Sequence, residues 1–231
     1  MNESRYLVLE GTVEKLEIFK HNVQFLNKSE KRKRTAGIVA TIQAAAGEPG
    51  AVHSNYAASD SGDSVEGFRM RLGAQAVSGN FWRTTFQDGD QVRAVGTMSG
   101  KIFHAVAVVR NADNVIWMQP HCERGSAAKK KHLFNYSLAF AFAVFLVQSF
   151  LLRNSDYPLW LILAMPASGV ALVLAVTVGL SWKDFMFFAR GMDKVGEALG
   201  IAAPAHIDLF KSTKKSEKLG KAYLPMGVYY L

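Results

Sequence analysis

The sequence predicts a mixed fold: a small N-terminal β-barrel of the OB type, then a transmembrane pair of helices, then a C-terminal amphipathic helix. Three observations predict it. Residues 5–118 alternate apolar and polar side chains in short runs, as half-buried strands do. Two long stretches without charge follow, and a helical apolar pattern comes after them. We therefore divide the chain into residues 1–128, 133–182 and 183–231.

The N-terminal domain contains several candidate strands: "RYLVLEGTVEKLEIF", "AGIVATIQA", "GFRMRLG", the hairpin "TTFQDGDQVRAVGTMSGKIFHAVAVVR" and "NVIWM". Asp88-Gly89 is a tight turn that leads into the first strand of the hairpin, and "SGK" is the turn between its two strands. Residues 44–67 are rich in Gly, Ser, Ala and Asp and predict a long loop, and the basic run 28–34 predicts a solvated turn. Five or so short strands favour a closed barrel, of the OB type or of an SH3-like type.

Two apolar stretches predict membrane spans. Leu133 to Leu152 is 20 residues without a charge, and Tyr157 to Trp182 is 26. A helix rises 1.5 Å per residue, so about 20 residues cross the hydrocarbon core of a bilayer. We expect a helical hairpin over residues 133–152 and 159–181; a buried helical pair in a globular domain is the alternative.

Basic residues near the spans predict the topology. They are plentiful before the first stretch and after the second, whereas the connector holds only Arg153, balanced by Asp156. Because lysine and arginine favour the cytoplasmic side, we expect both termini in the cytoplasm and the short connector outside. The flanking basic residues are Arg124, Lys129, Lys130, Lys131, Lys183, Arg190 and Lys194.

The segment after the spans has helical periodicity. Its apolar residues share one side of a helix, and Gly200 and Pro204 end it. Such a helix lies at the membrane interface or packs on the barrel, and we favour the interface. The remaining residues, basic and then aromatic, predict a mostly extended tail. The interface residues are Phe185, Phe188, Met192, Val195 and Leu199.

The chain carries no recognised catalytic or phosphate-binding motif, and we predict a non-enzymatic protein without cofactor or metal. His121 and Cys122 are adjacent, but a zinc site needs two further ligands and a nucleophile needs a base. We expect this pair to end the last strand and to fix the exit of the chain toward the membrane.

A candidate binding surface combines arginines with tryptophan: Arg69, Arg71, Trp82, Arg83 and Arg93. OB-type barrels stack bases on aromatic rings beside basic residues, so single-stranded nucleic acid is one alternative ligand. The other aromatic residues, however, suit the interior of a small barrel, and we favour that position for them: Phe68, Phe81, Phe86 and Phe103. The excess of 27 basic over 19 acidic residues is modest and is explained by topology and by an anionic lipid surface.

A pore-forming toxin is a further alternative, but the spans contain few polar side chains to line water. These are Gln148, Ser149, Ser168 and Thr177. Ser168 and Thr177 lie about 180° apart around a helix. We therefore favour an anchor over a pore.

The segments "EGTVEKLEIFK", "SGNFWRTTFQDGDQVRAVG", "IWMQPHCERG", "ALGIAAPAHIDLFKSTKK" and "GVYYL" resemble a bacterial family of type VI secretion system effectors. The resemblance covers the whole layout, although residues 44–67 are longer and looser than the corresponding loop of that family. It implies a link to interbacterial toxin delivery and a protein partner in that system, and it implies no catalytic residues. We expect a binding or scaffolding protein anchored in the bacterial inner membrane, either a delivered effector or a resident partner such as an immunity or accessory protein.

Overall fold

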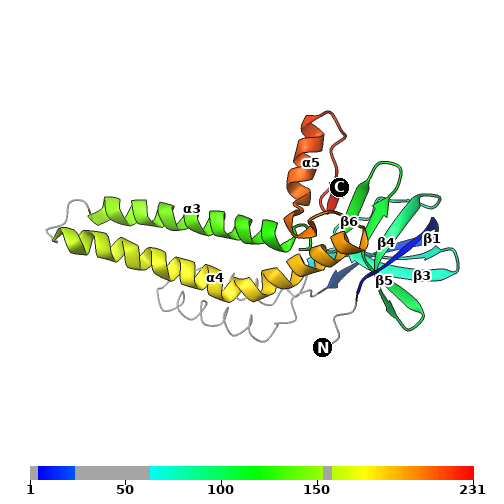
Figure 1. The fold of residues 1–231 in the computed structure, drawn as a ribbon, viewed down its shortest axis with the longest axis horizontal. Helices are drawn as coiled ribbons and strands as arrows, with labels where there is room; N and C mark the ends of the chain where they lie inside the picture. The colour runs from blue at the N-terminus through cyan, green and yellow to red at the C-terminus, as the bar shows by residue number, and fades with distance from the viewer. Residues whose placement is uncertain (1–4, 24–62, 153–157) are drawn as a thin grey trace.

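The chain, as a computed structural model, is described for residues 5–23, 63–152 and 158–231; a β-barrel lies at one end and two long helices extend from it (Figure 1). The expected strand 36–44 and basic run 28–34 lie outside the described residues. The strands are β1 (Leu7–Val23), β2 (Asp63–Leu72), β3 (Gln75–Phe81), β4 (Gln91–Ser99), β5 (Ile102–Arg110), β6 (Val115–Met118) and β7 (Val228–Tyr230). The helices are α3 (Ser126–Leu152), α4 (Leu159–Ala198), the 3-10 turn η1 (Pro204–His206) and α5 (Leu209–Lys218).

Five strands close the barrel. β1 pairs with β2 and β4, β2 pairs with β3, and β4 pairs with β5, all antiparallel. A parallel pairing of β3 with β5 completes the circle. The sheet then continues outward from β5 through β6 to β7. The expected small barrel is therefore confirmed, and the C-terminal strand belongs to its sheet.

β1 serves both sides of the barrel because it bends. Its first part, Leu7 to Thr12, pairs with β4, and its second part, from Val13, pairs with β2. The register shifts between Glu14 and Glu17, where Lys15 has a φ of 53°. A bulge of this kind increases local twist and curvature, which a long strand needs in order to join two parts of a closed barrel.

The barrel interior is filled with aromatic and aliphatic side chains. The Phe68 ring packs edge-on against Phe86 with centroids 5.3 Å apart, and Phe86 packs in the same way against Trp117 at 5.2 Å. The four phenylalanines proposed for the interior, Phe68, Phe81, Phe86 and Phe103, are all buried. Their expected role as barrel core is confirmed, and they are not available to stack on bases.

A second core lies outside the barrel, between the sheet and α4. Val109 and Ile116 on the strands meet Met192 and Val195 on the helix, and all four are buried. The face predicted to rest at the membrane interface therefore packs on the barrel instead. Phe188 is also buried there and Leu199 is half-buried; Phe185 belongs to α4, and its side chain lies outside the described residues.

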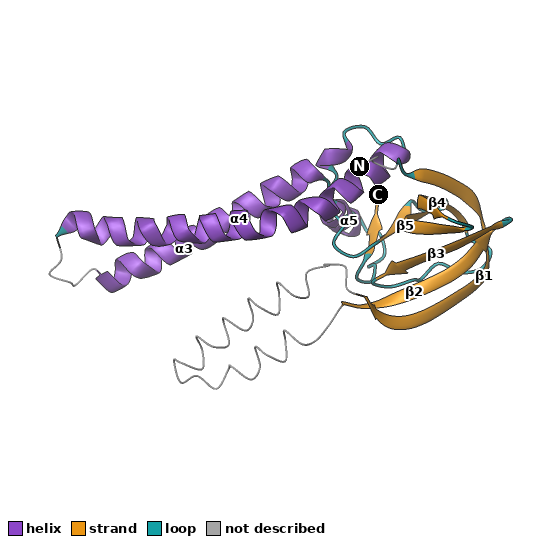
Figure 2. Cartoon of the chain, turned by 90° about the horizontal axis from the view of Figure 1, so that it is seen from below, coloured by secondary structure: helices purple, strands orange, loops and turns teal. Residues whose placement is uncertain are grey.

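α3 and α4 form the extended arm. The two helices lie side by side in both views and leave the barrel together (Figures 1 and 2). Within the described residues, the segment Ser126–Leu151 is the one helix that is long and apolar enough to cross a membrane. Only 11% of the apolar part of this helix is buried, whereas the core helix of a globular domain is mostly buried.

Several boundaries differ from the sequence prediction. α4 is one continuous helix of 40 residues, about 60 Å long, across the expected boundary at 182/183. β2 already begins at Asp63, inside the expected loop, and β3 was not predicted. α5 forms within the tail that was expected to be extended, with Asp208 as its N-cap: the carboxylate accepts a hydrogen bond from the Lys211 N–H at 3.1 Å.

We predict that Met192→Ala lowers the free energy of unfolding by about 2–5 kcal/mol, because it leaves a cavity between α4 and the sheet. Met226→Ala is the matched control, since Met192 is 0% exposed and Met226 is 67% exposed. Thermal unfolding of the detergent-solubilised protein measures both. Equal midpoints for the two variants would contradict the packing of α4 on the barrel.

Candidate functional site

The arginines of the candidate binding surface do not form one basic patch. Arg69 and Arg71 lie on β2, whereas Arg93 lies on β4, and β1 separates the two strands. The register places an acidic residue of β1 directly opposite each arginine: Glu17 opposite Arg69, Glu14 opposite Arg71 and Glu10 opposite Arg93. Cross-strand partners share a face at about 5 Å between Cβ atoms. This outer surface of the barrel is therefore close to charge-neutral.

The other two candidate residues, Arg83 and Trp82, already contact other residues of the chain. Arg83 donates to the buried carboxylate of Glu66 at 2.8 Å, and the Thr84 N–H donates to the same carboxylate at 2.7 Å. Trp82 lies against Gly227, where an added Cβ would stand 2.5 Å from the Trp82 Cβ, and its ring is 5.7 Å from the His121 ring. Trp82 therefore holds the C-terminal strand and is not a free platform for a base.

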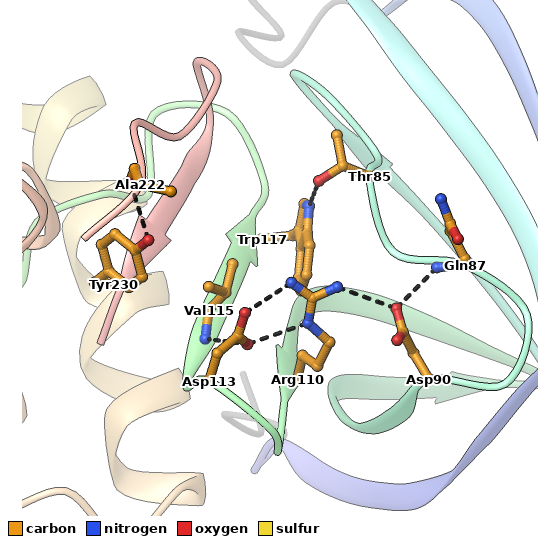
Figure 3. Close-up of polar contacts among 9 residues, drawn as sticks. All are labelled: Thr85, Gln87, Asp90, Arg110, Asp113, Val115, Trp117, Ala222 and Tyr230. Carbon is orange, nitrogen blue, oxygen red and sulfur yellow. Dashed lines mark hydrogen bonds and ion pairs between the residues drawn. The ribbon is translucent and has the colours of Figure 1, made fainter. Parts of the chain in front are cut away.

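A charged cluster lies at the surface of the barrel, where one arginine is paired with two aspartates (Figure 3). The Arg110 guanidinium lies 5.2 Å from the centroid of the Trp117 ring and forms ion pairs with Asp113 at 2.7 Å and Asp90 at 3.3 Å. The hydrogen bond from Arg110 holds the pKa of the Asp113 carboxyl below its usual range. The Trp117 indole N–H donates to Thr85 at 3.2 Å. In this arrangement Arg110 covers the buried Trp117 ring and is itself held by the two carboxylates.

His121 and Cys122 form the corner between β6 and α3. His121 has a φ of 69°, its N–H donates to Glu123, and its ring contacts Phe188 at 5.4 Å. Cys122 is 3% exposed and belongs to the core beneath α4. Burial raises the pKa of the Cys122 thiol, and the charge of Glu123 raises it further. Such a thiol is a poor nucleophile, so the pair serves to turn the chain.

The segment after Cys122 is tied to the segment before α5. The Arg124 guanidinium forms an ion pair with Asp208 at 3.1 Å and lies 4.6 Å from the centroid of the Phe210 ring. The backbone adds hydrogen bonds from Gly125 N–H to the Ile207 carbonyl at 2.9 Å and from Leu209 N–H to the Glu123 carbonyl at 3.0 Å. We call residues 120–126 with residues 203–209 the junction.

The junction also contacts both ends of the helical arm that lie next to the barrel, the start of α3 and the end of α4; we call these two ends the roots of the arm. The Asp193 carboxylate of α4 accepts a hydrogen bond from the Ser126 N–H at 2.8 Å, which caps the N-terminus of α3. Gly125 is required at this point, because an added Cβ would stand 2.7 Å from backbone atoms of Ala205. The start of α3, the end of α4 and the start of α5 are therefore fixed to one another and to the barrel.

Sequence reasoning recognised that the C-terminal tail is basic but missed the helix, α5, that presents its lysines. Four exposed lysines occupy this helix at spacings of three and four residues, next to a single glutamate, Glu217. Asp208 as an N-cap and the helical spacing of the lysines are the patterns that could have predicted it. The lysines are Lys211, Lys214, Lys215 and Lys218.

Within the described ranges, no group of three His, Cys, Asp or Glu side chains is placed to hold a metal ion. No protein-family model, no curated protein and no solved structure matches the chain. What the geometry offers is an exposed helical arm, a charge-balanced barrel and a lysine-bearing helix beside their junction.

We predict that Cys122 does not react with a water-soluble maleimide in the folded protein between pH 7 and 8 and reacts fully after denaturation. Burial keeps the reagent away from the sulfur, and the raised pKa of the thiol lowers the fraction of reactive thiolate. A cysteine introduced at the exposed Ala74 is the positive control. Mass spectrometry reads the modification, and native labelling of Cys122 within the time that labels position 74 would contradict the assignment.

Proposed function

We propose that this chain is a non-catalytic, membrane-anchored binding or scaffolding protein. A two-helix hairpin crosses the bacterial inner membrane and holds an OB-type barrel on the cytoplasmic side, with both termini in the cytoplasm. The observation that carries this proposal is the exposed apolar surface of Ser126–Leu151, since lipid is the partner that covers such a helix.

The proposed second span is the first part of α4. This helix runs beside α3, and residues 159–181 within it carry no charge. The two helices approach closely at Gly169, where an added Cβ would stand 2.8 Å from the Gln148 side-chain oxygen. The most polar side chain of the expected span thus faces the neighbouring helix, which favours an anchor over a water-lined pore.

The proposal that the barrel is of the OB type is based on the pairing of its five strands. A five-stranded Greek-key barrel of this type binds ligands over the face of its second and third strands. Here the basic residues of β2 lie opposite Glu14 and Glu17 of β1, so a protein partner suits this surface better than a nucleic acid. The resemblance noted above points to a partner of type VI secretion, either a component of toxin delivery or an immunity protein.

Reporter fusions in a Gram-negative host test the proposal. Fusions after Lys131 and after Lys194 are expected to report the cytoplasm, and a fusion at Ser155 to report the periplasm, because the basic residues flank the roots of the arm. A periplasmic signal from either root, or a cytoplasmic signal at residue 155 together with extraction by alkaline carbonate, would contradict the hairpin.

A further inference from the structure

α5 presents its lysines on the side turned away from the barrel. Leu209 and Thr213 are its buried residues, and α5 packs against β7. At 100° per residue these two residues define one side of the helix, and its four lysines spread around the opposite side. Lys221 adds a fifth exposed cation just beyond the helix, where it lies 4.5 Å from the centroid of the Tyr230 ring.

The position of α5 is fixed relative to the helical arm. α5 stands at the end of the barrel from which α3 and α4 leave, as both views show (Figures 1 and 2). Its N-cap, Asp208, is ion-paired with Arg124, two residues before the start of α3 at Ser126. The uncharged part of α3 begins at Leu133. Seven residues, or about 10 Å of helix, therefore separate Ser126, at the start of α3, from the start of its uncharged part.

That separation brings α5 into the field of a lipid surface. The headgroup layer adds roughly 5–7 Å on each side of the hydrocarbon core, and the potential of an anionic leaflet extends for a Debye length, about 8–10 Å at physiological salt. A lysine side chain adds several ångströms of reach. The lysine side of α5 therefore lies within range of the headgroups wherever α3 crosses the membrane.

Exposed apolar residues follow the lysines. Leu219 is 77% exposed, Tyr223 85% and Met226 67%, all on the segment that links α5 to β7. Lysines beside exposed aromatic and aliphatic side chains form the composition that binds the interface of an anionic bilayer. A binding site for nucleic acid or for an acidic protein would not need these residues beside a membrane-spanning arm.

We propose that α5 and residues 219–226 form a second, peripheral contact with the anionic phospholipid headgroups of the membrane that the arm crosses. This inference rests on the proposed membrane anchorage. The arm alone leaves the barrel free to tilt with the lipid, whereas a second contact beside the first fixes which face of the barrel points away from the membrane. The candidate ligand surface of β2 and β3 then has a defined orientation.

The test uses the full chain with Leu219→Cys, labelled with an environment-sensitive fluorophore, since native Cys122 is buried. The protein is reconstituted in vesicles of phosphatidylcholine alone or with phosphatidylglycerol. We expect a blue shift and protection from an aqueous quencher only with phosphatidylglycerol, reversed by high salt. Each lysine contributes about fivefold to such binding, so changing Lys214, Lys215 and Lys218 to Gln is expected to weaken it about 100-fold.

The matched control removes the same charge from the barrel by changing the exposed Lys15, Lys20 and Lys101 to Gln, and it is expected to keep the anionic-lipid response. A probe that stays equally exposed to water in both lipids, or a triple lysine variant that responds like the control, would overturn the proposal. So would a response to single-stranded DNA or polyglutamate that exceeds the response to phosphatidylglycerol. Resistance to alkaline carbonate is measured on the same samples, so failure of the anchor itself is seen separately.

Discussion

The packing of α4 on the outer face of the barrel is the interaction on which the rest of the structure depends. Phe188, Met192 and Val195 bury themselves against β5 and β6, which have the barrel core on their other side. Because α4 is continuous from the arm to this contact, no loop separates the apolar helices from the barrel. The junction adds a second link, in which Asp193 caps α3 and Arg124 holds Asp208. Removing either link leaves the other, so the arm and the barrel behave as one body.

The distribution of charge follows from this architecture. On the barrel, arginines of β2 and β4 face glutamates of β1, and Arg110 is held between two aspartates. The unbalanced positive charge lies instead at the root of the arm, on α5 and at the start of α3. A chain that used its barrel to bind a nucleic acid would carry its unbalanced positive charge on the barrel, to pair with the phosphates. The basic excess therefore lies on the side of the molecule from which the helical arm leaves the barrel.

The sequence predicted the elements whose patterns are local, and it missed those that depend on partners distant in the chain. The strand–turn–strand unit of residues 84–110, the aromatic core and the long apolar helix follow from periodicity and length. β3 was missed because "QAVSGNF" is small and polar, and pairing on both sides makes it a strand. The position of α4 was predicted wrongly, although "AVAVV" in β5 and "VIWM" in β6 could have indicated it, since continuous apolar strands are covered on both faces. α5 was missed although its lysines have helical spacing and Asp208 provides an N-cap.

The rigid union of barrel and arm is tested most directly by a distance measurement in a lipid bilayer. Cysteines introduced at the exposed positions Arg71 on β2 and Phe142 on α3 carry spin labels on the barrel and on the helical arm, and buried Cys122 stays unlabelled. Double electron–electron resonance is expected to give a single narrow distance distribution, because α4 and the junction leave no flexible connection between the labels. A broad or multimodal distribution would contradict the packing of α4 on the barrel as the constraint that organises the molecule.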